Sequence, residues 1–202
     1  MNTGTVSVRY AKALLQYAVE QGDADQVYLE MQTLAGRMRS VRAIHDRLVD
    51  PTVSVSDKCN LLEIAVTDGK KPLSGSSRAF YKLAVGAGRG DCLLFMAVSY
   101  QDLYRLRNGI VPVQLITATP VGEERRARLK QLVENVEHGR VEWTHSVDPS
   151  LDGGFVLLVD GFRLDASVAG KLQRIRKELI EKNTKRLMKL SLVFLLILLV
   201  RK

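Results

Sequence analysis

The side chains best suited to chemistry in this chain are three histidines and two cysteines, and their spacing argues against a catalytic or metal site. His45, His138 and His145 fall on an expected helix, loop and strand, with no serine or cysteine nearby in the context of an activated nucleophile. Cys59 and Cys92 have no CxxC spacing and no histidine at ligand spacing, so we expect both to pack as small apolar side chains. We therefore expect no catalytic residue, no bound metal and no cofactor.

A glycine-rich stretch at residues 86–90, Gly-Ala-Gly-Arg-Gly, resembles a phosphate-binding loop only in composition. Such a loop follows a strand and opens a helix, whereas the residues before Gly86 have helical periodicity. The chain also contains no Gly-Lys-Ser or Gly-Lys-Thr. The stretch is better interpreted as a turn between helices, and no small-molecule substrate is indicated.

The positive charge of the chain is confined to its C-terminal part. The whole chain has a net charge of +8, and residues 163–202, with eleven Lys or Arg and three acidic residues, carry all of it. Residues 1–162 are balanced, with 19 charges of each sign. The basic segment could be a solvated helix face, a nucleic-acid-binding helix or a membrane-surface adaptor. No Phe, Tyr or Trp stands between Arg163 and Lys189 to stack on bases, which disfavours nucleic acid.

An apolar tail follows the basic segment. Residues 190–200 are almost wholly apolar and are flanked by Lys189 and Arg201. As a helix they would span about 16 Å, well short of the ~30 Å hydrocarbon core of a bilayer. Residues 187–202 are therefore a tail of uncertain status. It could contact lipid shallowly, lie in an apolar partner groove, or be a terminal accident of the reading frame.

These residues must be positioned by a fold whose first half is helical. Apolar residues recur at helical spacing from Val6 to Arg107, and Asn108-Gly109 is a typical helix end. We expect an N-terminal six-helix bundle in residues 1–107. Its helices are expected at residues 6–21, 25–38, 40–49, 57–68 with Ser56 as cap, 77–87 and 91–107.

From residue 110 the pattern changes to strands. Residues 110–119 and 141–147 are rich in β-branched residues or alternate, and a polar helix is expected at residues 122–137. Gly153-Gly154 open an apolar run that Asp160-Gly161 turn back as a hairpin.

The last expected element of this part is a basic helix. Asp165 or Ser167 should cap it, and its face with Val168, Leu172, Ile175 and Leu179 is expected to pack on the sheet. Residues 110–186 thus form a small α/β domain, and the fold class is α+β.

Several short motifs occur together in a characteristic order. They are Arg9-Tyr10-Ala11-Lys12-Ala13-Leu14, then Gly109-Ile110-Val111 leading to Thr117-Ala118-Thr119-Pro120, then Asp148-Pro149-Ser150-Leu151-x-Gly153-Gly154-Phe155, and finally Asp165-x-Ser167-Val168-x-x-x-Leu172. In this order and spacing the chain resembles the delta subunit of the bacterial F-type ATP synthase, counterpart of the mitochondrial oligomycin-sensitivity-conferring protein. The resemblance covers about residues 5–186.

The resemblance implies a non-catalytic stator connector. The helical bundle would hold the N-terminal helix of an alpha subunit at the top of the catalytic head, in a groove between its first and fifth helices. The second domain would join the b subunits of the peripheral stalk, so that the head does not turn with the rotor. No nucleic acid is implied as a partner. The groove positions are Tyr10, Ala11, Leu14, Tyr17, Ala18, Phe80, Leu83, Ala84 and Ala87.

The resemblance also bears on the second domain and on location. Gly153, Gly154, Asp165 and Ser167 match the family's second motif, and we expect them to form turns and caps. The motifs begin eight residues into the chain, which leaves no room for a transit peptide and predicts a peripheral protein on the cytoplasmic face of a bacterial membrane. Membrane contact is expected only through the complex, apart from a shallow contact by the tail.

Overall fold

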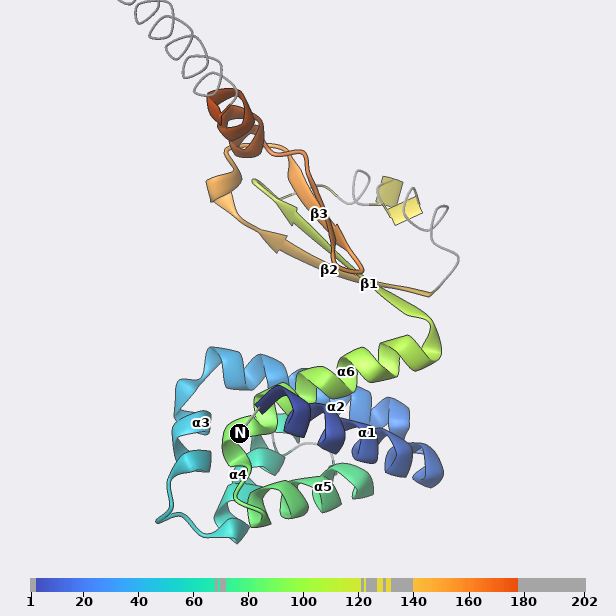
Figure 1. Cartoon of the computed structure of the whole chain (residues 1–202), viewed down its shortest axis with the longest axis vertical. Coiled ribbons are helices and arrows are strands. Elements are labelled where there is room, and N and C mark those ends of the chain that lie inside the picture. The colour runs from blue at the N-terminus through green and yellow to red at the C-terminus, as the bar shows by residue number, and fades with distance from the viewer. Residues whose placement is uncertain are drawn as a thin grey trace, which may run out of the picture. The chain divides into compact units, whose positions relative to one another are not determined.

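The chain forms two compact units, Met1–Gly109 and Ile110–Lys202, in the computed structural model (Figure 1). The first is named the helical unit and the second the sheet unit. The described part of the helical unit consists of helices, and the described part of the sheet unit contains both strands and helix. The expectation of an α+β fold is confirmed. The structure describes residues 3–67, 69, 72–120, 122, 127–128, 130–131 and 140–177.

Helices of the helical unit pack around a core of long apolar and aromatic side chains. Tyr28 and Tyr104 stack with ring centroids 4.3 Å apart, and Tyr81 and Tyr100 are almost fully buried. The described elements are α1 (Thr3–Gln21), α2 (Ala24–Ser40), α3 (Arg42–Val49), α4 (Val55–Thr67), α5 (Gly75–Gly86), the short 3-10 helix η1 (Gly90–Cys92) and α6 (Leu93–Asn108).

The ends of these helices follow local capping chemistry. α6 ends at Asn108, and the Gly109 that follows it has a φ of 60°, the left-handed conformation that glycine adopts without strain. The hydroxyl of Ser74 accepts a hydrogen bond from the Ser77 amide and so caps α5. The expected cap of α4 was wrong. The helix begins at Val55, and the amide of Asp57 donates to the hydroxyl of Ser54 rather than to Ser56.

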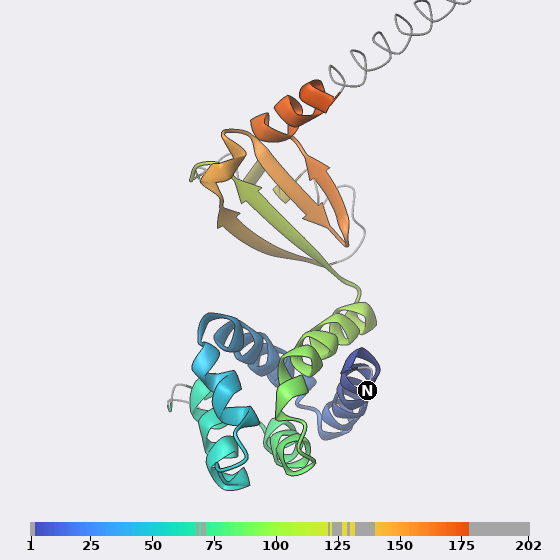
Figure 2. The same ribbon diagram turned by 60° about the vertical axis from the view of Figure 1, so that its left-hand side comes forward.

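The sheet unit contains a mixed four-stranded sheet in the order β2-β1-β3-β4 (Figure 2). β1 and β2 are parallel, so a crossover must connect them, and the polar helix expected at residues 122–137 lies largely outside the described residues. β3 pairs antiparallel with β1, and β4 pairs antiparallel with β3. The strands are β1 (Ile110–Thr117), β2 (Arg140–Val147), β3 (Phe155–Val159) and β4 (Phe162–Asp165).

A two-residue turn joins β3 to β4. Asp160 and Gly161 both have positive φ, 43° and 83°, as the mirror-image turn of a tight hairpin requires. Gly154, just before β3, is also left-handed, and a Cβ atom there would lie 2.3 Å from the carbonyl oxygen of Ala166. The hairpin therefore closes on the segment after β4 so tightly that only glycine fits at position 154.

Asp165 and Ser167 organise the start of the basic helix, residues 168–177. Asp165 accepts hydrogen bonds from the amide and the hydroxyl of Ser167, and the Ser167 hydroxyl accepts one from the Gly170 amide. Ser167 is thus the residue that caps the helix, and Asp165 holds Ser167. The two bonds from Ser167, together with one from Arg163, lower the pKa of Asp165 to about 2.

The expectation that the basic helix packs its apolar face on the sheet was wrong. Val168, Leu172 and Ile175 are 43%, 58% and 54% exposed. Leu179, the fourth residue of that face, lies outside the described residues. The spacing of these residues is that of an amphipathic helix, but spacing alone does not say whether the apolar face meets the protein's own core or a partner.

Candidate partner-binding groove

A groove of about 240 Å³ lies between α1 and α5 in the helical unit. Its lining is mainly apolar because both helices present aromatic and aliphatic side chains at helical spacing. Tyr17 and Leu83 are 43% and 60% exposed, which is unusual for large apolar side chains on a folded domain. The lining residues are Tyr10, Ala13, Leu14, Tyr17, Ser76, Ala79, Phe80 and Leu83.

The structure places the nine sequence-predicted groove positions in three different environments. Five of them, Tyr10, Leu14, Tyr17, Phe80 and Leu83, line the groove together. Three alanines do not, because they are fully buried in the core beneath it, and Ala87 is an exposed residue at the C-terminal end of α5. The alanines without access to a ligand are Ala11, Ala18 and Ala84.

The sequence analysis missed three residues that line the groove, and all three are small. Ala13 is three residues from Tyr10, Ser76 is four residues before Phe80, and Ala79 is four before Leu83. Residues at these separations share a helix face, so the spacing could have identified them. Their small side chains make the hollow, because larger ones at these positions would fill it.

A carboxylate from the α1–α2 turn fixes one end of the groove. Asp23 accepts a hydrogen bond of 2.7 Å from the Ser76 hydroxyl and one of 3.3 Å from the Ser76 amide. Ser76 is itself a lining residue near the start of α5. The end of α1 is thereby joined to the beginning of α5, across 53 residues of sequence.

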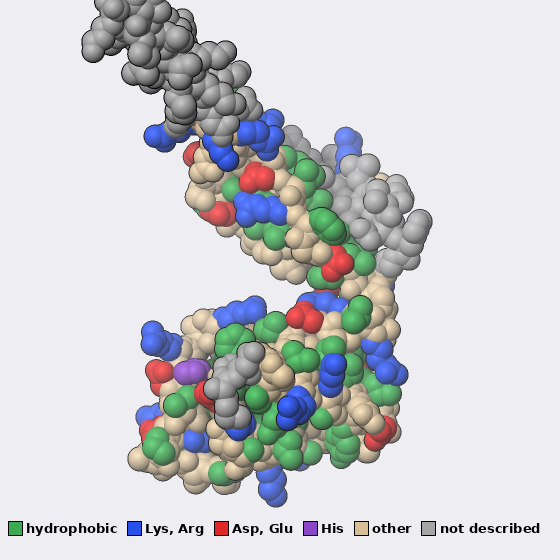
Figure 3. Space-filling model, viewed as in Figure 1, with side chains coloured by type: hydrophobic (Ala, Val, Ile, Leu, Met, Phe, Trp, Pro, Cys, Tyr) green, Lys and Arg blue, Asp and Glu red, His purple; other side chains and the backbone are tan. Residues whose placement is uncertain are grey.

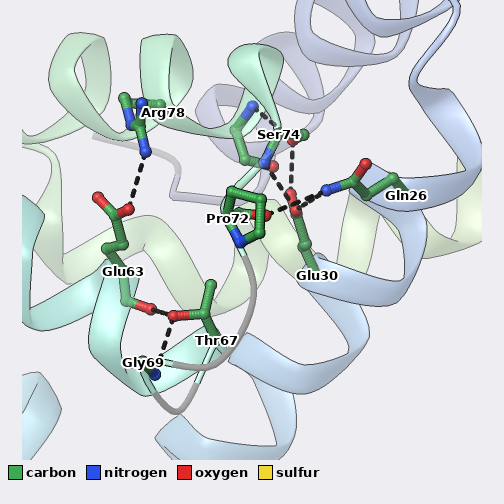
Figure 4. A network of polar contacts seen from close by, with 9 residues as sticks. Gln26, Glu30, Glu63, Thr67, Gly69, Pro72, Ser74 and Arg78 are labelled. Carbon is green, nitrogen blue, oxygen red and sulfur yellow. Dashed lines mark hydrogen bonds and ion pairs between the residues drawn. The ribbon is translucent and has the colours of Figure 1, made fainter.

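A second carboxylate holds the same helix start from α2 (Figure 4). Glu30 is 7% exposed and accepts hydrogen bonds from the Ser74 amide at 2.8 Å, the Ser74 hydroxyl at 2.6 Å and the Gln26 side chain at 2.9 Å. A buried carboxylate is costly unless such donors satisfy it. Glu30 therefore ties α2 to the capping residue of α5 and sets where one wall of the groove stands.

Polar groups deeper in this region are less well satisfied. Tyr81 is buried, and its hydroxyl, like that of Ser77, has no hydrogen-bond partner among the described residues. Burial raises the pKa of Tyr81, and the nearby charge of Glu30 raises it further. Tyr81 therefore remains neutral and acts as a core residue behind the groove.

A larger hollow of about 540 Å³ lies beside α2 and the end of α4. Its walls include polar groups that already bond one another, since the Gln26 side chain also donates to the Pro72 carbonyl and the Thr67 hydroxyl to the Glu63 carbonyl (Figure 4). Arg78 of α5 pairs with Glu63 at 2.8 Å nearby. These contacts are those of a helix junction, and they offer no set of groups converging on a ligand.

The sheet unit presents a different kind of surface. Phe162 and Leu164 of the edge strand β4 are 80% and 59% exposed, in addition to the uncovered apolar face of the basic helix. Figure 3 shows Lys and Arg side chains gathered around this helix. The basic residues within its described part are Lys171, Arg174, Arg176 and Lys177.

The described residues offer little else that could carry chemistry. Among them, no three His, Cys, Asp or Glu side chains come together as a metal site. Burial raises the pKa of both Cys59 and Cys92, so neither is an activated thiol. No helix in the described ranges is long and apolar enough to cross a membrane.

Comparison with known proteins agrees with this architecture. The model of the ATP synthase delta (OSCP) subunit family matches residues 6–179. The chain belongs to this family. It is 39% identical over 183 residues to the ATP synthase subunit delta of Bacteroides fragilis, with 91% of this chain and 98% of that protein covered. The corresponding subunit of Bacteroides thetaiotaomicron is 37% identical with the same coverage.

A solved structure shows the same fold. A chain of the mitochondrial ATP synthase hexamer of Toxoplasma gondii, determined by cryo-electron microscopy, superposes with a TM-score of 0.67 at 20% identity, covering 86% of this chain and 97% of that one. As a member of the delta (OSCP) family, the chain is a non-catalytic subunit of the peripheral stalk of an ATP synthase.

Proposed function

We propose that this subunit is the connector that joins the top of the catalytic head to the b subunits of the peripheral stalk. A rotor turning inside the head would drag the head with it unless a stator held it. The connector needs no catalytic group for this role. It needs two binding surfaces that do not release under torque, one on each side.

The groove between α1 and α5 is the surface proposed for the head. The observation that carries the proposal is the coincidence of an apolar hollow with exposed Tyr17 and Leu83 on the same two helices. An amphipathic helix lying in such a groove gains roughly 25 cal/mol for each Å² of apolar surface removed from water. The proposed occupant is the N-terminal helix of an alpha subunit.

The surface proposed for the stalk is the apolar face of the basic helix, together with β4. Val168, Leu172 and Ile175 are exposed there beside basic residues. A stalk helix with an apolar stripe and acidic flanks would cover the apolar face and pair with the bases. The two surfaces belong to different units, so binding at one end does not require the other.

The two proposed binding surfaces assign a separate role to each part of the chain. Residues 1–107 would act as a six-helix bundle for the head, residues 110–186 as an α/β domain with a basic C-terminal helix for the stalk, and residues 187–202 as a tail outside both. The site of action would be the cytoplasmic face of a bacterial membrane, reached through the complex.

Calorimetric titration of the full chain with a synthetic N-terminal segment of its alpha subunit tests the head contact. Leu83→Asp places a charge in the groove at a position already 60% exposed, so binding should weaken about tenfold or more while folding is retained. Leu106→Asp is the matched control, because Leu106 is 81% exposed on α6 and does not line the groove. Equal affinity for Leu83→Asp and the unchanged chain would contradict the assignment.

A second role is favoured by the basic helix alone. An exposed apolar face bordered by Lys and Arg is also suited to the surface of an anionic bilayer. Flotation with phosphatidylserine vesicles tests this membrane-surface role. Flotation that Leu172→Asp abolishes would support it, and a chain that stays at the bottom of the gradient would exclude it.

A further inference from the structure

We propose that the groove between α1 and α5 accepts its partner helix in one direction only, because its two ends carry opposite charge. The partner is then an amphipathic helix with acidic residues toward one end and basic residues toward the other. This inference rests on the proposed head contact and adds to it the polarity of the ligand.

The two helices that form the groove run antiparallel. Asp23, just beyond the end of α1, bonds Ser76 at the start of α5, so these two points lie together. The 3-10 helix η1, which follows α5, contacts α1 as well. The groove therefore runs from the junction of Asp23 with Ser76 toward the first half of α1.

An acidic end and a basic end can be defined along this direction. Glu20 and Asp23 form the acidic end, beside the start of α5. Arg9 lies eleven residues before Glu20 on the same helix, which is about 16 Å along its axis. Arg9 marks the basic end.

The two charges on α1 border the apolar lining. Arg9 is four residues before Ala13, and Glu20 is three residues after Tyr17, so each is a surface neighbour of a lining residue. Both are exposed, and the Glu20 carboxylate accepts a hydrogen bond from Gln16 at 3.2 Å. A helix in the groove would therefore pass within reach of a positive charge at one end and a negative charge at the other.

Apolar contacts and charges contribute differently to such a complex. The apolar lining supplies affinity but is nearly indifferent to the direction of a helix, because leucine-like side chains fit either way. Charges distinguish the two directions, since a reversed helix would place like charges together at both ends. The apolar tail of this chain is a poor occupant by the same criterion, because Lys189 and Arg201 give it basic residues at both ends.

Paramagnetic labels on the ligand can read the direction. Two peptides with identical apolar positions are needed, one with acidic residues first and basic residues last, the other with these charges exchanged. Each carries a spin label at its N-terminus or at its C-terminus, and broadening of backbone amides is recorded in the full chain. For the acid-first peptide, the N-terminal label should broaden amides near Arg9 and the C-terminal label those near Glu20. The exchanged peptide should give the reverse.

Charge variants of the chain complete the test. The double variant Arg9→Glu with Glu20→Arg should abolish the original preferred direction of both peptides, because the basic end becomes acidic and the other end, where Asp23 stays negative, becomes neutral. Kd should stay within about threefold, because the apolar lining is untouched. Arg42→Glu is the control, since Arg42 is exposed on α3 and does not line the groove. It should leave the direction unchanged.

The outcomes separate this inference from the head contact itself. Peptides that bind in one direction whatever their charge order, or in both directions equally, would overturn the inference and leave the groove assignment standing. Failure of both peptides and of the alpha segment to bind would overturn the head contact, and the polarity with it.

Discussion

The helical unit and the sheet unit expose apolar surface in opposite ways. In the helical unit the surface is a hollow between two helices whose relative position is held by Asp23 and Glu30. In the sheet unit it is the outward face of one amphipathic helix, with no described element covering Leu172 or Ile175. The first surface has its shape without a partner, whereas the second would be enclosed only by the partner proposed for it.

This difference indicates where each unit is sensitive to substitution. A preformed groove depends on buried supports, so changes far from the ligand should alter it. An open helix face depends on little beneath it, so its apolar residues should matter for binding and hardly at all for folding. Substitutions in the two units should therefore separate stability from binding to different degrees.

The largest effect is expected at Gly154 in the sheet unit. Gly154→Ala would put a Cβ atom 2.3 Å from the Ala166 carbonyl oxygen at a φ of 75°, and the sheet unit should lose about 3 kcal/mol or more of unfolding free energy. Urea unfolding followed by the fluorescence of Trp143, the one tryptophan of the chain, reports on this unit.

Gly161→Ala is the matched control for this change. Its φ of 83° is as strained for alanine, but nothing lies within 4 Å of the added Cβ, so about 1 kcal/mol is expected. Far-UV circular dichroism should show the helical unit still folded in Gly154→Ala. Simultaneous loss of both units would contradict this expectation and show that the two units unfold together.

An effect of about 2 kcal/mol is expected for Glu30→Gln in the helical unit. The amide would replace a carboxylate that accepts three hydrogen bonds in a buried place, and its NH2 group would face the Ser74 hydroxyl or amide. Thermal unfolding by circular dichroism measures the loss. Glu20→Gln, at an exposed position on α1, should change stability by less than about 0.5 kcal/mol. If Glu30→Gln proved as stable as Glu20→Gln, Glu30 would not be a support of the groove.

A pH-dependent contribution is expected from Asp165. Its pKa is lowered to about 2 in the folded chain, chiefly by the hydrogen bonds from Ser167. A group with a lowered folded pKa stabilises the fold fully above its unfolded value, here 3.8, and that stabilisation is lost as pH falls toward 2. The urea midpoint reported by Trp143 should therefore drop across this window.

Asp165→Asn should flatten this pH response and already lower the midpoint at neutral pH, because the carboxylate that holds Ser167 is gone. Asp160→Asn in the hairpin turn is the control, since asparagine also tolerates the left-handed conformation of that residue. A pH response that persists unchanged in Asp165→Asn would show that another group is responsible.

The smallest effect on folding is expected at Leu172. This side chain is 58% exposed, so Leu172→Ser should change the unfolding free energy by less than about 0.5 kcal/mol. Binding to a soluble fragment of the stalk b subunit should nevertheless weaken severalfold. A stability loss of several kcal/mol would mean that the apolar face of the basic helix supports the fold after all.

Local patterns predicted the parts of this molecule that depend on local physics. The Asp160-Gly161 turn and the end of α6 before Gly109 follow from spacing and conformational preference. The shared surface of Tyr10, Leu14 and Phe80 was instead implied by the family resemblance. Helical periodicity also identified most of the helices to within a few residues.

Long-range contacts were beyond such reasoning. The bonds from Ser76 to Asp23 and from Ser74 to Glu30 join residues 53 and 44 positions apart, and neither pair has a pattern that marks it in the sequence. The prediction that the basic helix packs on the sheet was wrong for a different reason. An apolar stripe has the same spacing whether it faces the protein's own core or a partner, so Val168 and Leu172 could not reveal which.

Titration of the same chain with both partners tests most directly whether each unit binds a different partner. Calorimetry with the alpha N-terminal segment and with a b-subunit fragment should show that Leu83→Asp weakens only the first, by about tenfold or more, and that Leu172→Asp weakens only the second by a similar factor. A variant that weakens both partners, or leaves its own partner bound as before, would contradict the account of two separate surfaces.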